Sequence, residues 1–202
     1  VLTRMKDFVY SSTMQLTVKI KLIPDAAQKE LLLRTMVAFN SAANDAAKAG
    51  FNSQVFSQPS IHKLAYYAIR DEHKLGAQLA GGAIAKAVEC FKRDNKTCPN
   101  FRPRSAIVYD QRIMSFKGLA HVSLASLDGR LVIPMIIGGY QESKLQAAIK
   151  TGQADLVYID STFYLLLSIK MNDVPVKESS EVLGVDFGVV NIATDSEGNV
   201  YT

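Results

Sequence analysis

The sequence has little cysteine, little histidine and no tryptophan. Its two cysteines, Cys90 and Cys98, match neither a disulfide framework nor a zinc-knuckle spacing, so we expect reduced thiols, as in an intracellular protein. The histidines His62, His73 and His121 show no ligand spacing either, and we expect them on the surface or in the core. The low cysteine and histidine content argues against a disulfide-rich secreted domain and against a zinc finger.

Long apolar runs are also missing. The chain has no uninterrupted apolar run of about 18 residues, and residues 1–8 lack the apolar centre of a secretion signal. We therefore predict a cytoplasmic protein without a membrane partner. Its 202 residues suffice for one large domain or two small ones.

The net charge of +4 hides an uneven distribution. Residues 1–171 hold all but one of the 23 Lys and Arg, whereas residues 172–202 are acidic. The densest positive stretch runs from Lys86 to Lys117. Because Lys and Arg that neutralise phosphates release counterions, a basic body favours nucleic acid as the partner and, with it, association with the nucleoid. The acidic final segment suits a divalent metal instead.

The stretch 181–194 places one carboxylate, Asp186, in a run of β-branched and apolar residues. This pattern predicts a buried strand, and a buried carboxylate usually binds a metal, meets a cation or accepts several N–H bonds. Gly184 and Gly188 flank Asp186, and glycine allows a phosphate or a metal-bound group to approach closely. The turn signal at 195–199 then puts Asp186 on the first strand of a β-meander.

Three protein classes use a Gly-x-Asp-x-Gly strand: RNase H-like nucleases, in which the Asp holds Mg²⁺, actin-like ATPases and protein kinases. No His-Arg-Asp loop precedes Asp186, which excludes the kinases. Val189 and Val190 stand where an ATPase would have hydroxyl residues. An ordinary Asp that caps a turn is a further alternative. We expect Asp195 and Glu197 to be solvated turn residues at the far end of the hairpin from Asp186, rather than metal ligands.

Periodicity predicts a strand, three helices and a series of shorter strands. Residues 14–23 alternate strictly, so Leu16, Val18, Ile20 and Leu22 are expected on the buried face. Helices are expected from Pro24-Asp25 to Gly50, from near Pro59 with a stripe of Ile61, Leu64, Ala65, Ala68 and Ile69, and over 77–94. The glycine pair at 81–82 in the third helix predicts an unusually close neighbour. Strands are expected at 107–116, 121–124, 130–136, 154–159 and 163–170, with a helix at 141–150.

These elements predict an α+β fold: a small β-barrel interrupted by a helical insert and followed by the first strands of an RNase H-like domain. The predicted divisions are a leader at 1–13, a barrel at 14–23 and 96–171, a helical recognition insert at 24–95, a linker at 172–180 and the nuclease start at 181–202.

Several short motifs occur in a definite order. They are Pro-Asp-Ala-Ala-Gln at 24–28, Phe91-Lys92, Pro99-Asn100-Phe101-Arg102, the stretch 127–134 and Gly-Val-Asp-Phe-Gly at 184–188. Together these motifs resemble the TnpB proteins of insertion sequences, which are compact relatives of type V CRISPR effectors. In one place the chain departs from the family, because Ala-Gln-Leu-Ala-Gly-Gly at 77–82 stands where a Ser-Gln-Val-Ala-Gln-Gln-like run is common and keeps only Gln78.

The resemblance implies a wedge-like oligonucleotide-binding barrel, a helical recognition insert and the start of a RuvC-type nuclease domain. It also implies a guide RNA, a double-stranded DNA target with a short adjacent motif, and Mg²⁺ held in part by Asp186. The family's later carboxylates and its zinc-binding insert would lie beyond Thr202. The sequence is thus expected to be an N-terminal portion that is inactive alone, with the missing half or a second protomer as a further partner.

The predicted function is the nucleic-acid-binding part of a transposon-associated, RNA-guided DNA endonuclease. A nuclease-inactive RNA-guided regulator is the alternative, and an actin-like ATPase is less favoured because it would not need the basic stretch from Lys86 to Lys117. Asp186 is the candidate catalytic residue and metal ligand. The candidate RNA- and DNA-binding residues are Lys19, Lys21, Arg34, Gln78, Lys92, Arg93, Lys96, Arg102, Arg104, Arg112 and Lys117.

Overall fold

The computed structural model describes residues 13–173, 183–188 and 192–201. Residues 1–12 of the predicted leader and residues 174–180 of the predicted linker lie outside the described residues. The chain divides into two compact units, residues 1–172 and residues 173–202. Within the described ranges, no helix is long and apolar enough to cross a membrane.

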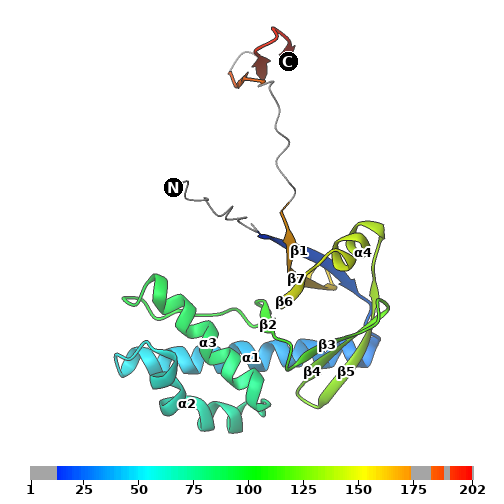
Figure 1. The fold of residues 1–202 in the computed structure, drawn as a ribbon. Helices are drawn as coiled ribbons and strands as arrows, with labels where there is room; N and C mark the ends of the chain where they lie inside the picture. The colour runs from blue at the N-terminus through cyan, green and yellow to red at the C-terminus, as the bar shows by residue number, and fades with distance from the viewer. Residues whose placement is uncertain (1–12, 174–182, 189–191, 202) are drawn as a thin grey trace, which may run out of the picture. The chain divides into compact units, whose positions relative to one another are not determined.

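The first unit combines helices with a seven-stranded antiparallel sheet, in the order β2-β6-β7-β1-β5-β4-β3 (Figure 1). Its strands are β1 (Thr13–Leu22), β2 (Ile107–Tyr109), β3 (Met114–Lys117), β4 (His121–Ser126), β5 (Gly129–Ile136), β6 (Lys150–Ile159) and β7 (Thr162–Asn172). The sheet is nearly closed, because only residues 110–113 separate the edge strands β2 and β3 along the chain. In addition, the Tyr109 hydroxyl donates to the Ala125 carbonyl over 2.8 Å. The predicted α+β class is confirmed, with a barrel-like sheet.

Strand β1 is central to this sheet and pairs with β7 from Thr13 to Lys21. Val18, Ile20 and Leu22 are buried, while Lys19 and Lys21 on the other face are exposed, as the alternation predicted. A shift of one residue in the pairing would move both lysines into the core and the apolar residues into water. The hydrophobic pattern therefore fixes the register, and with it the face on which the two lysines lie.

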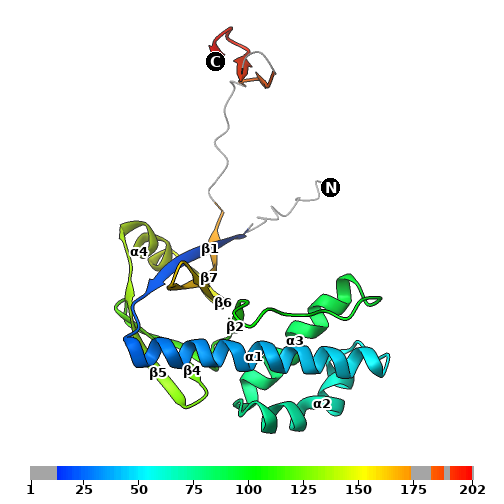
Figure 2. The same ribbon diagram turned by 180° about the vertical axis from the view of Figure 1, so that it is seen from behind.

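Three helices form the insert between β1 and β2: α1 (Ala26–Asn52), α2 (Gln58–Glu72) and α3 (Ala77–Arg93). The first begins at a capping box, in which the Asp25 carboxylate accepts from the Gln28 backbone and the Gln28 side chain accepts from the Asp25 backbone. Figure 2 shows α1 running along the sheet and on past it to α2 and α3. A shorter helix, α4 (Gly139–Gln146), joins β5 to β6.

The close neighbour predicted at the glycine pair exists at one of the two positions. A Cβ added to Gly82 would lie 3.3 Å from Cε2 of the buried Phe39 ring on α1, whereas a Cβ on Gly81 would meet nothing within 4 Å. Gly82 thus lets α3 pack against α1 at this point. Both glycines also line a cleft that is described below.

Two predictions about these elements are wrong. The stretch 107–116 is not one strand, because the carboxylate of Asp110 accepts from the backbone of Arg112 over 2.9 Å and turns the chain between β2 and β3. The apolar stripe on α2 is also narrower than predicted. Leu64 is 49% exposed, and only Ile61, Ala65 and Ile69 are buried on this helix.

The second unit contains β8 (Val185–Asp186), β9 (Ala193–Asp195) and β10 (Val200–Tyr201). They form an antiparallel sheet in the order β10-β9-β8. This is the meander that the turn signal at 195–199 predicted. Its assignment to a nuclease domain stays a prediction.

Candidate nucleic-acid interface

A cleft of about 880 Å³ lies between the helical insert and the edge of the sheet. Helix α2 contributes His62 and Tyr66 to its lining, α3 contributes Gln78 and Lys86, and β6 contributes Asp155. Aromatic rings, cations and hydrogen-bonding side chains thus face one space. Such a mixture suits a ligand that offers both flat apolar faces and polar edges.

One end of the cleft carries a group of three polar side chains. Gln78 Nε2 donates to Asp110 Oδ2 over 2.8 Å, and the guanidinium of Arg112 donates to the same oxygen from Nη2 over 2.7 Å. Desolvation raises the pKa of Asp110, but the hydrogen bonds and charge of Arg112 outweigh it, so the pKa is lowered overall. The carboxylate therefore stays ionised and can only accept, which fixes the orientation of the Gln78 amide.

The basic segment that leads into β2 is fastened to the helices at several points. On α1, the buried side chain of Asn40 donates through Nδ2 to the carbonyls of Pro103 (3.2 Å) and Ser105 (2.9 Å). From α3, the Lys86 ammonium donates to Asn40 Oδ1 over 2.6 Å and to the Ala106 carbonyl over 2.7 Å. Two helices therefore hold the backbone of residues 103–106.

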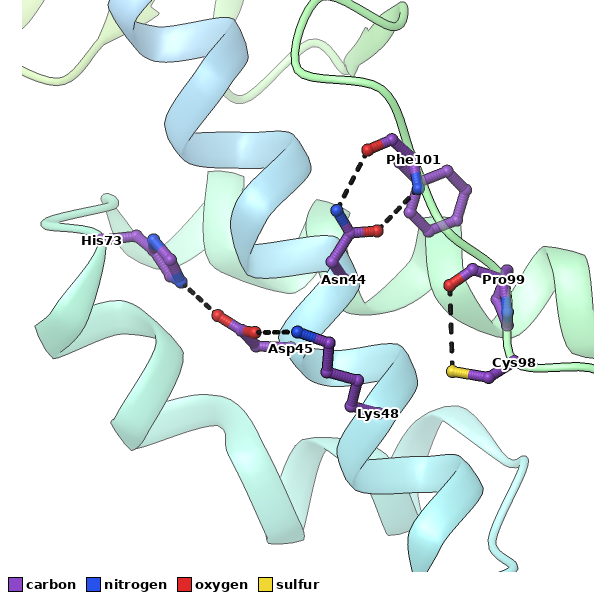
Figure 3. A network of polar contacts seen from close by, with 7 residues as sticks. All are labelled: Asn44, Asp45, Lys48, His73, Cys98, Pro99 and Phe101. Carbon is purple, nitrogen blue, oxygen red and sulfur yellow. Dashed lines mark hydrogen bonds and ion pairs between the residues drawn. The ribbon is translucent and has the colours of Figure 1, made fainter.

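One helical turn along α1, Asn44 makes a second attachment. Its Nδ2 donates to the Phe101 carbonyl over 3.0 Å, and its Oδ1 accepts from the Phe101 backbone N–H over 2.6 Å (Figure 3). The ring of Phe101 lies 4.8 Å from Lys86 Nζ. We call residues 101–106, held in this way by Asn40, Asn44 and Lys86, the pinned segment.

Arg102 and Arg104 project from the pinned segment and are both exposed. A segment without regular secondary structure normally loses conformational entropy when it binds. Because hydrogen bonds already fix the protein backbone here, the two arginines would lose less conformational entropy on binding. A surface that binds a nucleic-acid backbone benefits from such an arrangement.

Lys86 is the one cation in the cleft that burial perturbs clearly. Desolvation lowers its pKa to about 8, against the opposing influence of Cys90 and Asp155. Burial also raises the pKa of Asp155, and the charge of Lys86 opposes that rise. Both groups line the cleft, and each is partly deprived of water.

The lowered pKa predicts a pH dependence of stability that belongs to Lys86. Between pH of about 8 and 10.5 the unfolded chain keeps the proton that the folded chain has lost, so the free energy of unfolding gains a contribution that rises with pH. Lys86→Met removes this contribution. We expect the difference in unfolding free energy, wild type minus Lys86→Met, to increase from pH 7.5 to pH 10 in denaturant titrations. A difference that is flat over this range would contradict the assignment.

The outer face of the sheet extends the cleft toward β1. Cross-strand pairing aligns Val108, Asp155, Leu166 and Lys19 in one row over β2, β6, β7 and β1. Lys19 Nζ lies 4.1 Å from the centroid of the Tyr164 ring, and Tyr164 pairs in turn with Lys21. The two lysines predicted on β1 therefore lie on the same sheet face as the cleft residues Val108 and Asp155.

The other predicted cations are spread over the first unit. Arg34 forms an ion pair with Asp128 over 3.5 Å, and Lys92 forms one with Glu89 over 2.6 Å. Arg93, Lys96 and Lys117 are exposed. Figure 1 shows the end of α3 and strand β3 in different parts of this unit. The eleven candidates therefore do not make one patch; the pinned segment, the cleft and the outer face of β1 are the parts that lie together.

The aromatic residues of α2 add to the cleft. Tyr66 packs against the edge of the core, lines the cleft and stacks on His62 with the ring centroids 4.2 Å apart. Tyr67 is 79% exposed and meets Tyr66 edge-on. Their i and i+4 spacing on one helix face allows the stack of His62 and Tyr66. These rings form a platform on which a base can stack.

Asp186 does not occupy the buried strand that its apolar neighbours predicted. It lies in β8, an edge strand, and it is exposed together with Val185 and Phe187. Among the described residues, β9 is the only strand that pairs with β8. Apolar sequence alone cannot bury a strand that has no layer packed over it.

The prediction for Asp195 is wrong. Asp195 is in β9 directly opposite Val185, so it lies beside Asp186 rather than at the far end of the hairpin. It is buried and accepts from the backbones of Glu197 and Asn199, from Asn199 Nδ2 and from the Tyr201 hydroxyl. These hydrogen bonds lower the pKa of Asp195, and the bond from the Asn199 side chain contributes most. Asp195 organises the turn, and alternation directs its side chain away from that of Asp186.

These positions bear on the expected magnesium site. A two-metal site needs several carboxylates on one face. Among the described residues of the second unit, Asp186 is the only carboxylate on its face of the two paired strands, because Asp195 points to the other face and is occupied by its turn. The residues described here do not fit such a site, and the role of Asp186 as a magnesium ligand stays a prediction.

A different group of potential metal ligands was not predicted from the sequence. Ligand atoms of Asp45, Glu72 and His73 lie within 4.8 Å of one another. His73 Nε2 is 2.8 Å from Asp45 Oδ2, and Lys48 Nζ is 3.6 Å from Asp45 Oδ1 (Figure 3). The ammonium of Lys48 already compensates the charge of Asp45, so this group is explained as a link between α1 and the end of α2.

Comparisons with known proteins do not assign the chain to a family. A scan against protein-family models and a search of curated proteins find no match. Support for a function therefore comes from the geometry of the described residues and from the resemblance of the sequence motifs.

Proposed function

We propose that the first unit is the nucleic-acid-binding part of an RNA-guided DNA endonuclease of the TnpB kind. In this proposal its barrel-like sheet acts as the wedge-like oligonucleotide-binding barrel, and α1–α3 act as the recognition insert. A structured guide RNA is the principal partner, and double-stranded DNA next to the target is the second.

The observation that carries the proposal is the pinned segment. Asn40, Asn44 and Lys86 hold its backbone with hydrogen bonds, while Arg102 and Arg104 remain exposed. A chain that used these arginines only for solubility would not need to fix the backbone between them. Fixed, exposed arginines suit phosphates, which a guanidinium can contact through two N–H groups at once.

The cleft supports a contact with bases. His62 and Tyr66 on α2 offer a surface on which a base can stack, and Gln78 on α3 offers an amide of fixed orientation. One hydrogen of Nε2 is bound to Asp110, so the other hydrogen and Oε1 can still pair with an adenine edge. We assign to this cleft the short DNA motif beside the target.

This assignment predicts that Gln78→Ala alters sequence preference more than affinity. Selection from a library of duplex DNAs with one randomised segment, using the chain with its bound RNA, should recover an adenine-containing motif with the wild type. With Gln78→Ala, enrichment of that adenine should fall about tenfold, since one bidentate contact discriminates by about 1–3 kcal/mol. Arg70→Ala, which removes an exposed side chain of α2, serves as the control. An unchanged motif with Gln78→Ala would remove Gln78 from base recognition.

The experiment that tests the function as a whole is a salt titration of binding. Fluorescence anisotropy should show that the chain binds a structured RNA and that log Kobs falls linearly with log salt concentration. A parallel titration with a polycarboxylate of equal charge separates nucleic-acid binding from general attraction to polyanions. If both polyanions bind equally, the proposal is wrong.

The nuclease part of the proposal depends on Asp186 and on the resemblance of its motif. The described residues of the second unit offer one carboxylate on the relevant face, which is too few for cleavage by two metal ions. Magnesium binding by Asp186, and a zinc site elsewhere in a complete protein of this family, belong to the proposal only through the resemblance.

A further inference from the structure

Three segments far apart in sequence bring two cations to one tyrosine. Lys29 comes from the start of α1, Arg104 from the pinned segment and Tyr158 from β6. The Lys29 Nζ and the Arg104 Cζ each lie 5.7 Å from the centroid of the Tyr158 ring. Neither Lys29 nor Tyr158 was a candidate from the sequence.

The position of this group is well defined. Lys29 Nζ donates to the Ser161 carbonyl over 3.1 Å. Asp160 and Ser161 have φ of 46° and 60°, which are the left-handed values of a tight two-residue hairpin turn between β6 and β7. On its inner side the Tyr158 ring packs against Phe163, with centroids 4.7 Å apart. The turn and the core thus fix the tyrosine, and the turn also holds the lysine.

The charges of this group are not balanced locally. Among the described residues, no carboxylate oxygen lies within 4.0 Å of the Lys29 or Arg104 nitrogens. The pKa of Tyr158 is lowered, and a hydrogen bond with the Ser161 side chain is the largest cause. Desolvation acts in the opposite direction. The hydrogen bond and charge of Lys29 and the charge of Arg104 lower the pKa further. A phenol hydroxyl between two cations is a good donor to an anion.

We propose that Lys29, Arg104 and Tyr158 bind one phosphodiester group of a nucleic-acid backbone. The inference rests on the proposed function and adds a specific site to it. The two cations neutralise the phosphate, the tyrosine hydroxyl donates to one of its oxygens, and Arg104 continues the path of the pinned segment. RNA and DNA share this chemistry, so the experiment has one arm for each.

The test is a salt titration of Lys29→Met, which removes the charge and keeps most of the aliphatic stem. In the arm whose phosphate occupies the site, structured RNA or duplex DNA, the slope of log Kobs against log salt should become shallower, by less than about 1 because Arg104 still contacts the same phosphate. Lys29→Arg should restore the slope. Tyr158→Phe should weaken binding at every salt concentration and leave the slope unchanged. Lys48→Met, which removes one charge from the far part of the same helix, should leave both arms as in the wild type.

Two results overturn the site alone, and a third overturns it together with the proposed function. If Lys29→Met matches the wild type in both arms while the wild type binds with a steep slope, the site is wrong and the proposed function stands. If Lys29→Met and Lys48→Met lower the slope equally, the effect is one of net charge and the site is again wrong. Failure of the wild type to bind either nucleic acid overturns the proposed function and this site with it.

Discussion

Replacing Asn40 with Ala is expected to destabilise the first unit by about 2–4 kcal/mol, because a hydrogen bond to a partly buried ammonium is removed and the carbonyls of two residues lose a donor. The amide of Asn40 is fully buried and joins Lys86 of α3 to the carbonyls of Pro103 and Ser105. Unfolding in urea, followed by circular dichroism, measures the change. Asn40→Asp should also destabilise, since a carboxylate can accept from Lys86 but cannot donate to the carbonyls.

The same substitution should loosen the pinned segment before the unit unfolds. Trypsin cleaves after Arg104 but poorly after Arg102, because Pro103 follows it. We expect slow cleavage after Arg104 in the wild type and cleavage that is faster by an order of magnitude or more in Asn40→Ala. Asn52→Ala, at the exposed end of α1, is the matched control and should change stability by less than about 0.5 kcal/mol. Equal behaviour of Asn40→Ala and Asn52→Ala would contradict the role of Asn40.

The second large effect is expected on RNA binding when Arg102 and Arg104 are both replaced with Ala. Both side chains are exposed, so the unfolding free energy should change little. If Arg102 neutralises one phosphate and Arg104 shares another with Lys29, the slope of log Kobs against log salt should become shallower by about 1 to 2 in the double variant. Affinity at low salt should fall much more than affinity at high salt.

The control for this pair removes the same charge from elsewhere in the same unit. Lys48 and Lys63 are exposed on α1 and α2, so the double replacement Lys48→Ala/Lys63→Ala leaves the same net charge as the arginine pair. Its salt dependence should stay close to that of the wild type. If the two double variants behave alike, the arginines act only through net charge and the pinned segment is not part of the interface.

Much of the first unit could be predicted from local patterns. The strict alternation at 14–23 identified β1 and its buried face, and the Pro-Asp start and apolar spacing identified α1. These features depend on neighbours within a few residues, which is where periodicity carries information. The prediction of one strand over 107–116 was wrong for the opposite reason, because the Asp110 carboxylate accepts from the Arg112 backbone N–H and interrupts an apparently continuous pattern.

The pinned segment and the charge cluster at Tyr158 could not be predicted in this way. Asn40 and Asn44 look like ordinary polar residues of an amphipathic helix, and their partners lie 57 to 65 residues away along the chain. No period marks such contacts. Asp195 shows the same limit in the second unit, since its turn residues were recognised but its burial and its place opposite Val185 depend on the register of β8 and β9.

The central claim is that this chain holds a specific structured RNA. The most direct test is to purify the chain gently from cells that also carry the DNA flanking its gene. Unprotected nucleic acid is then digested and the remainder is sequenced. We predict one abundant RNA species of uniform ends, whose recovery falls sharply in the Arg102→Ala/Arg104→Ala variant and not in Lys48→Ala/Lys63→Ala. Recovery of no nucleic acid, or of a random sample of cellular RNA that is equal in both variants, would contradict the claim.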